Sequence, residues 1–215
     1  MVPAVQPEMT GPLVAIVDIQ MGNVRSVDAA LRFVGAEPRF VAQPEELDHF
    51  NFIVLPGVGS FRMASERLEA SGLAEAIVRK VRGGSRVLGI CLGMQLLGTS
   101  STEDGLTGGL GLLKMKVEKF GSNEIGDAPL PNIGFAPVEF DPFPLMDDIS
   151  PGSDFYFVHS YRVVGEVSDS WVATSRYGVE FVAAVGQGSV LGTQFHPEKS
   201  QGQGLRLLAN FVRHF

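Results

Sequence analysis

The sequence has one cysteine, one tryptophan and no long apolar run. A single cysteine cannot form a disulfide within the chain, which favours a reducing compartment such as the cytoplasm. No segment approaches the roughly 20 consecutive apolar residues that a membrane-spanning helix needs. The chain also lacks runs of lysine or arginine and has a net charge of -7. We therefore expect neither a nucleic-acid partner nor a membrane partner.

The chain has 215 residues, of which 45% are hydrophobic, enough for one domain with a large core. Its first eleven residues, MVPAVQPEMTG, have neither the basic nor the apolar region of a secretory signal, and they contain two prolines. We expect a single domain over residues 1–215, with residues 1–11 as a flexible extension.

Apolar, β-branched runs alternate with helical patterns in the first half of the chain. The expected strands are 13–19, 38–42, 52–60 and 86–90. The expected helices are 23–33, 61–82 with a break at Gly72, and one that starts over 92–98. This alternation predicts an α/β fold with three layers, in which helices cover both faces of an open, mostly parallel sheet.

The second half of the chain contains short strand candidates separated by turns, a pattern typical of antiparallel sheets. They are 112–120, 133–140, 154–164, 171–177, 181–190 and 190–196. A last helix is expected from about 203 to 213. Segments 99–109 and 121–131 are rich in turn-forming residues and are expected to be surface loops. The sequence thus predicts an antiparallel extension of the parallel sheet.

The only cysteine, Cys91, lies in Gly-Ile-Cys-Leu-Gly between a predicted strand and a predicted helix. This is the pattern of a nucleophile elbow, a tight turn that presents a reactive side chain at the edge of the sheet. Flanking glycines remove Cβ atoms that would clash there. The start of the helix favours the thiolate, and the N–H of Leu92 is placed to stabilise an oxyanion. The alternative is a buried structural cysteine.

A thiol nucleophile needs a base, and His196 in QFHPEKS is the best candidate. Pro197 favours an extended backbone at His196, and alternate residues of an extended segment point the same way. The carboxylate of Glu198 can then orient the imidazole and stabilise its protonated form. A strand-end histidine beside a surface glutamate is an equally good explanation of this pattern.

Five stretches in order, MGNVRSVDAAL, LPGVGSF, GICLGMQLL, FYFVHSY and QFHPEKSQGQG, resemble the class I (triad) glutamine amidotransferases. They cover nearly the whole chain, and they are most similar to the glutaminase subunits of imidazole glycerol phosphate synthase, from histidine biosynthesis. The resemblance implies that the chain hydrolyses L-glutamine to glutamate and ammonia. It also implies a heterodimer with a (β/α)₈ cyclase subunit, which uses the ammonia to make imidazole glycerol phosphate and AICAR.

The resemblance gives roles to the three residues of the triad. Cys91 is the nucleophile that forms a glutamyl thioester, His196 the base, and Glu198 the residue that orients His196. The Pro-Gly-Val-Gly loop, with Val58 and Gly59, supplies the second oxyanion donor besides Leu92. An ordinary strand-end turn is the alternative for this loop.

The resemblance also implies a substrate site and a partner surface. The residues implied in glutamine binding are Gly57, Gln95, His159, Ser160 and Tyr161, and those implied in partner contact are Asn23, Arg25, Asn132, Phe135 and Lys199. A packed aromatic strand end is the alternative for 159–161, and solvated surface positions are the alternative for Asn23, Arg25 and Lys199. The sequence has neither a Cys/His cluster with metal-ligand spacing nor a dinucleotide motif, so no metal or organic cofactor is expected.

One stretch, LPNIGFAPV, departs from the Pro-His-x-Gly-Trp-Asn pattern of the family. Asn132, Phe135 and Ala136 replace its histidine, tryptophan and asparagine. A paralogous subunit that feeds ammonia to another acceptor, such as an amidino sugar of a surface polysaccharide, is therefore an alternative function. Two further alternatives are another Cys-elbow hydrolase and a non-catalytic binding subunit. The distant His-Pro-Glu motif argues against the first, and the intact triad argues against the second.

Overall fold

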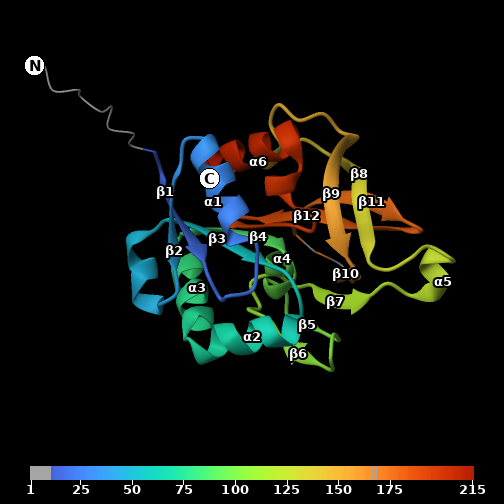
Figure 1. Ribbon diagram of the computed structural model, residues 1–215, viewed down its shortest axis with the longest axis horizontal. Coiled ribbons are helices and arrows are strands. Elements are labelled where there is room, and N and C mark those ends of the chain that lie inside the picture. The colour runs from blue at the N-terminus through green and yellow to red at the C-terminus, as the bar shows by residue number, and fades with distance from the viewer. Residues whose placement is uncertain (1–10, 166, 168) are drawn as a thin grey trace, which may run out of the picture.

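The computed structural model describes residues 11–165, 167 and 169–215 (Figure 1). Its centre is a nine-stranded sheet with the strand order β2-β1-β3-β4-β13-β12-β11-β8-β9. The flexible extension expected over 1–11 lies, apart from Gly11, outside the described residues.

Half of this sheet is parallel, as the alternating pattern predicted. Its strands are β1 (Leu13–Val17), β2 (Glu37–Val41), β3 (Phe52–Gly57), β4 (Arg86–Cys91) and β13 (Val190–Thr193). β13 pairs in parallel with β4, so the last strand of the chain returns to the middle of the sheet. Parallel strands end at the same edge, and this places the residues after β3, β4 and β13 next to one another.

Helices cover both faces of the parallel half (Figure 1). One face carries α1 (Val24–Phe33) and α6 (Gln201–His214), and the other carries α2 (Phe61–Ala70), α3 (Leu73–Arg82) and α4 (Leu92–Leu96). Val14 and Ile16 of β1 pack on the first face, and Ala15 and Val17 on the second. Both faces of the strand are buried, which explains its continuous apolar run.

The predicted break at Gly72 is confirmed, because Gly72 has a φ of 74° between α2 and α3. A left-handed conformation of this kind is cheap for glycine and ends a helix. The longest helix is α6, with 14 residues. In the part of the chain that the structure describes, no helix has the length and apolar character to cross a membrane.

The antiparallel extension is also confirmed. Its strands are β8 (Asn132–Phe140), β9 (Ser153–His159), β11 (Trp171–Tyr177) and β12 (Val179–Gln187). The pairs β8/β9, β8/β11, β11/β12 and β12/β13 are all antiparallel. β12 therefore joins the extension to the parallel half through β13.

A second sheet has the order β10-β7-β5-β6 and lies beside the extension. It contains β10 (Tyr161–Val164), β7 (Lys116–Lys119), β5 (Ser100–Ser101) and β6 (Thr107–Gly108). The expectation of plain loops was wrong in both segments. Segment 99–109 holds β5 and β6, which form a hairpin docked on β7, and segment 121–131 holds the one-turn helix α5 (Ser122–Ile125). The described part of the chain also contains three short 3₁₀ helices: η1 (Pro44–His49), η2 (Pro144–Met146) and η3 (Pro197–Lys199).

Candidate active site

Cys91 lies on a sharp turn between β4 and α4. Its φ of 54° and ψ of -109° are rare for a residue with a side chain. A Cβ on Gly93 would lie 1.7 Å from the carbonyl oxygen of Leu55, and one on Gly89 would lie 2.6 Å from the carbonyl carbon of Gly93. Both glycines of the motif are therefore required by backbone contacts, and the predicted elbow geometry is present.

His196 reaches Cys91 because β13 lies next to β4. Ile90 pairs with Thr193, and His196 follows three residues later. Its Nδ1 lies 2.8 Å from Oε1 of Glu198, and both side chains are only 2% exposed. Nδ1–H is therefore donated to the carboxylate, while Nε2 makes no hydrogen bond to any residue within the described ranges. This leaves Nε2 free to take a proton.

The surroundings of His196 favour its protonated form. Burial by itself lowers the pKa of His196, but the neighbouring Cys91 sulfur and Glu198 carboxylate outweigh it and raise the pKa to about 9. An imidazole beside a thiol, with a carboxylate on its other nitrogen, is the arrangement in which a histidine can act as the base for a cysteine nucleophile.

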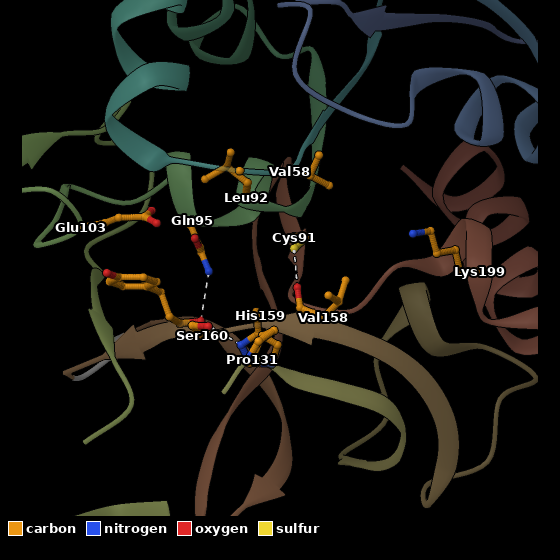
Figure 2. A pocket seen from close by; sticks show the side chains of 12 residues that line it. Val58, Cys91, Leu92, Gln95, Glu103, Pro131, Val158, His159, Ser160 and Lys199 are labelled. Carbon is orange, nitrogen blue, oxygen red and sulfur yellow. Dashed lines mark hydrogen bonds between the residues drawn. The ribbon is translucent and has the colours of Figure 1, made fainter. Parts of the chain in front are cut away.

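A cavity of about 510 Å³ opens beside Cys91 (Figure 2). It is lined by Val58, Gly59, Cys91, Leu92, Gln95, Glu103, Pro131, Val158, His159, Ser160, Tyr161 and Lys199. Nearly all the residues predicted for the oxyanion and substrate sites are in this lining. Gly57 is the exception, because it is buried under Leu92. A Cβ added to Gly57 would lie 3.1 Å from the Cβ of Leu92. Gly57 therefore gives Leu92 room and does not face the cavity.

Glu103 is a residue of the cavity that the sequence analysis missed. Figure 2 shows it at the opposite end of the cavity from Lys199, with Cys91 between them. Its Oε2 accepts a hydrogen bond of 2.8 Å from the N–H of Phe61, the first residue of α2, and its burial raises the pKa of its carboxyl group. In the sequence, Glu103 stands in a turn-rich segment without any periodicity. Only the docking of the β5–β6 hairpin brings it to the site.

The carbonyl oxygen of Tyr161 organises the floor of the cavity. It accepts hydrogen bonds from Gln95 Nε2 at 3.1 Å and from His159 Nδ1 at 2.8 Å. Burial lowers the pKa of His159 to about 4, so this imidazole is neutral and its Nε2 is an acceptor. Asn132 Nδ2 lies 3.3 Å from that nitrogen. Asn132 is only 6% exposed, so it supports His159 and does not present its side chain on the surface expected to meet a partner.

The other residues predicted at the partner surface are exposed in the free chain. Phe135 is 50% exposed and packs edge-to-face on Tyr156, with 5.5 Å between the ring centroids. The amino group of Lys199 lies 5.6 Å from the centroid of the same Tyr156 ring. Asn23 and Arg25 lie at the start of α1. The turn before them packs on the predicted oxyanion loop, residues 56–59, because a Cβ on Gly22 would be 3.6 Å from the Cα of Gly57.

Comparison with known proteins agrees with this geometry. The family model described as glutamine amidotransferase class-I matches residues 15–215. The chain belongs to the class-I glutamine amidotransferase family. This amidotransferase is 44% identical over 203 residues to the imidazole glycerol phosphate synthase subunit HisH of Geobacillus kaustophilus, a match that covers 93% of this chain and 96% of the relative. It is 42% identical to the HisH subunit of Syntrophotalea carbinolica, over 93% and 98% of the two chains.

A solved structure has the same fold. The structure of PurLQS from Thermotoga maritima superposes with a TM-score of 0.74 over 95% of this chain and 99% of the other, at 21% identity. The predicted fold of a class I amidotransferase, with a parallel sheet, an elbow and an antiparallel extension, is therefore confirmed.

We expect the variant Glu198→Gln to lower the pKa of His196, since it removes a carboxylate that favours the imidazolium. In the wild type, the folded-state pKa of His196, about 9, lies above the ordinary histidine value of 6.5. Proton binding therefore stabilises the fold fully below about pH 6.5, and this stability is lost as the pH rises through about 9. The wild type should have a higher free energy of unfolding than the variant, and this difference should be larger at about pH 6 than at about pH 9.5. Urea denaturation at both pH values measures this, and an equal difference would contradict the ion pair.

Proposed function

We propose that this chain is the glutaminase subunit of an imidazole glycerol phosphate synthase, a single cytoplasmic amidotransferase domain that releases ammonia from L-glutamine. The observation that carries the proposal is the position of the triad. Cys91 lies at the wall of a cavity, with His196 beside it and Glu198 on the far nitrogen of the imidazole. The identity to HisH subunits supports the pathway.

In the proposed reaction, His196 Nε2 takes the proton of Cys91, and the sulfur attacks the carbonyl carbon of the glutamine side-chain amide. The negative oxygen of the tetrahedral intermediate is stabilised by the N–H of Leu92 and by an N–H of the loop with Val58 and Gly59. His196 then gives its proton to the leaving nitrogen, so that ammonia departs and a glutamyl thioester remains. Water, deprotonated by His196, hydrolyses the thioester to glutamate and restores the thiol.

Glutamine carries an α-ammonium group, and in this proposal Glu103 binds it. Glu103→Gln should raise the KM for glutamine about tenfold with a smaller change in kcat, because the amide lacks the charge but still accepts the hydrogen bond from Phe61 N–H. Steady-state kinetics of glutamate release measures both constants. The exposed neighbour Asp104 bonds Ser60 instead, and Asp104→Asn is the matched control. Equal KM values for wild type and Glu103→Gln would exclude this role.

We also propose that the surface around Phe135, Tyr156 and Lys199, together with Asn23 and Arg25, binds the cyclase subunit. Lys199 lines the cavity, and both its amino group and the half-exposed ring of Phe135 lie against Tyr156, so this surface adjoins the site at which ammonia is released. The turn before Asn23 also packs on the oxyanion loop, so a partner bound there is placed to adjust that loop.

Purification of the native complex, with the partner identified by mass spectrometry, tests the proposal. A (β/α)₈ cyclase that stimulates glutamine hydrolysis well above the rate of the isolated chain would support it. A partner from sugar modification would keep the glutaminase chemistry and replace the pathway. That second outcome is favoured by one observation, the departure from the family pattern at Asn132, Phe135 and Ala136.

A further inference from the structure

Gln194 is a fully buried polar residue that joins the nucleophile to the substrate site. It follows β13 directly and is 0% exposed. Its Nε2 lies 3.7 Å from Cys91 Sγ, and its Oε1 accepts a hydrogen bond of 2.9 Å from Gln95 Nε2. We propose that Gln194 is a positioning residue of the glutaminase site. One end of its amide holds the sulfur of Cys91 as a thiolate, and the other end orients Gln95 towards the substrate. This inference rests on the proposed function.

The direction of both amides is fixed by the carbonyl oxygen of Tyr161, which can only accept hydrogen bonds. Gln95 must therefore turn its Nε2 towards Tyr161, and its second N–H points to Gln194. Gln194 must accept this hydrogen bond through its Oε1, so its Nε2 faces the sulfur of Cys91. Reversal of either amide would bring two donors or two acceptors into contact. Because both N–H groups of Gln95 are used, its Oε1 is left as the acceptor for a donor group of the substrate.

Besides His196, two polar groups lie near Cys91 Sγ, and they favour different protonation states. The carbonyl oxygen of Val158, 3.8 Å away, can accept only from the S–H group and so favours the thiol (Figure 2). The N–H of Gln194 donates to the sulfur, and this bond strengthens when the sulfur becomes negative. When the proton moves to His196, the contact with Val158 loses its hydrogen and the contact with Gln194 gains. Gln194 therefore shifts the balance towards the reactive form.

Alkylation by iodoacetamide measures this balance without any dependence on glutamine. Cys91 is the only cysteine of the chain, so the alkylation rate reports this thiol alone. In Gln194→Met, which keeps the length of the side chain and loses the donor, the pH midpoint of alkylation should rise by about one unit. In Gln194→Glu, which keeps the acceptor towards Gln95 but turns an oxygen to the sulfur, it should rise at least as much. His196 beside the sulfur, and Glu103, His159, Tyr161 and Lys199 in the cavity, are unchanged in both variants.

A second buried amide provides the structural control. Asn210 is 1% exposed and donates to the carbonyl oxygens of Leu145 and Asp147, and none of these three residues lines the cavity. Asn210→Leu should lower the thermal unfolding temperature and leave the alkylation midpoint at the wild-type value. Circular dichroism shows which variants are folded. If one of the two variants at position 194 does not fold, the other still tests the inference.

Kinetics with glutamine tests the other end of the amide. Gln194→Met and Gln95→Met should each raise the KM, and the double variant should raise it by less than the product of the two effects, because both remove the same contact. A wild-type alkylation midpoint in folded Gln194→Met and Gln194→Glu would overturn the inference. Failure of the wild-type complex to consume glutamine would instead overturn the proposed function, and the alkylation result would still stand by itself.

Discussion

Cys91→Ala is expected to reduce glutamine hydrolysis by ~10⁴-fold or more, because the thioester route needs the sulfur, which alanine lacks. The members of a triad act as a unit, so His196→Ala should cost a similar factor, and the double variant should cost little more than either single one. Glutamate release from the complex with the partner measures these rates. A Cys91→Ala complex that hydrolyses glutamine at a tenth of the wild-type rate would exclude Cys91 as the nucleophile.

The control for Cys91→Ala is the reaction of the partner with free ammonia. Alanine has the same backbone restrictions as cysteine at a φ of 54°, so the elbow should keep its conformation and the complex should still form. Addition of an ammonium salt should then restore product formation in the Cys91→Ala complex. A variant that cannot be rescued in this way has lost assembly, and its lost hydrolysis says nothing about chemistry.

Gly93→Ala is expected to destabilise the fold by about 4 kcal/mol or more, or to prevent folding. The added Cβ would lie 1.7 Å from the carbonyl oxygen and 2.8 Å from the carbonyl carbon of Leu55. These are backbone atoms of β3, which is paired with β1 on one side and β4 on the other, so they cannot move aside. Relief of the clash would require α4 and its cysteine to lift away from the sheet.

Urea denaturation of Gly93→Ala measures the effect, with Gly202→Ala as the matched control. Gly202 lies in the first turn of α6, is exposed, and has no atom within 4 Å of the position of an added Cβ. Alanine there should stabilise the helix slightly, by about 0.5–1 kcal/mol. If Gly93→Ala unfolds at the same urea concentration as the wild type, the close contact between α4 and β3 is wrong.

The sequence predicted the parts of the site that depend on local pattern. The elbow at Cys91 is encoded by two glycines within five residues, and the pairing of His196 with Glu198 by a proline between them. The sequence did not predict Glu103 or Gln194, because their roles depend on distant pairings. Gln194 meets a sulfur 103 positions away, and Glu103 meets the start of α2 only after β5 docks on β7.

The two loop predictions failed for a related physical reason. Segment 99–109 has the glycine and serine content of a turn, yet two residues on each side of its tip form β5 and β6, because β7 offers a free edge for β5. Strands of two residues carry too few side chains for a period to be visible. The prediction for Asn132 was limited in another way, since the family pattern gives the position of a residue along the chain but not its burial.

The place of β13 between β4 and β12 has a consequence for synthesis of the chain. The first four parallel strands are complete once residue 91 has left the ribosome, but their neighbour on the open side of β4 is made about 100 residues later. Until then β4 is an exposed edge, and the thiol at its end has no base. The strand that closes the edge also brings His196 and Gln194, so protection against edge-to-edge aggregation and the ability to split glutamine arise in the same folding step.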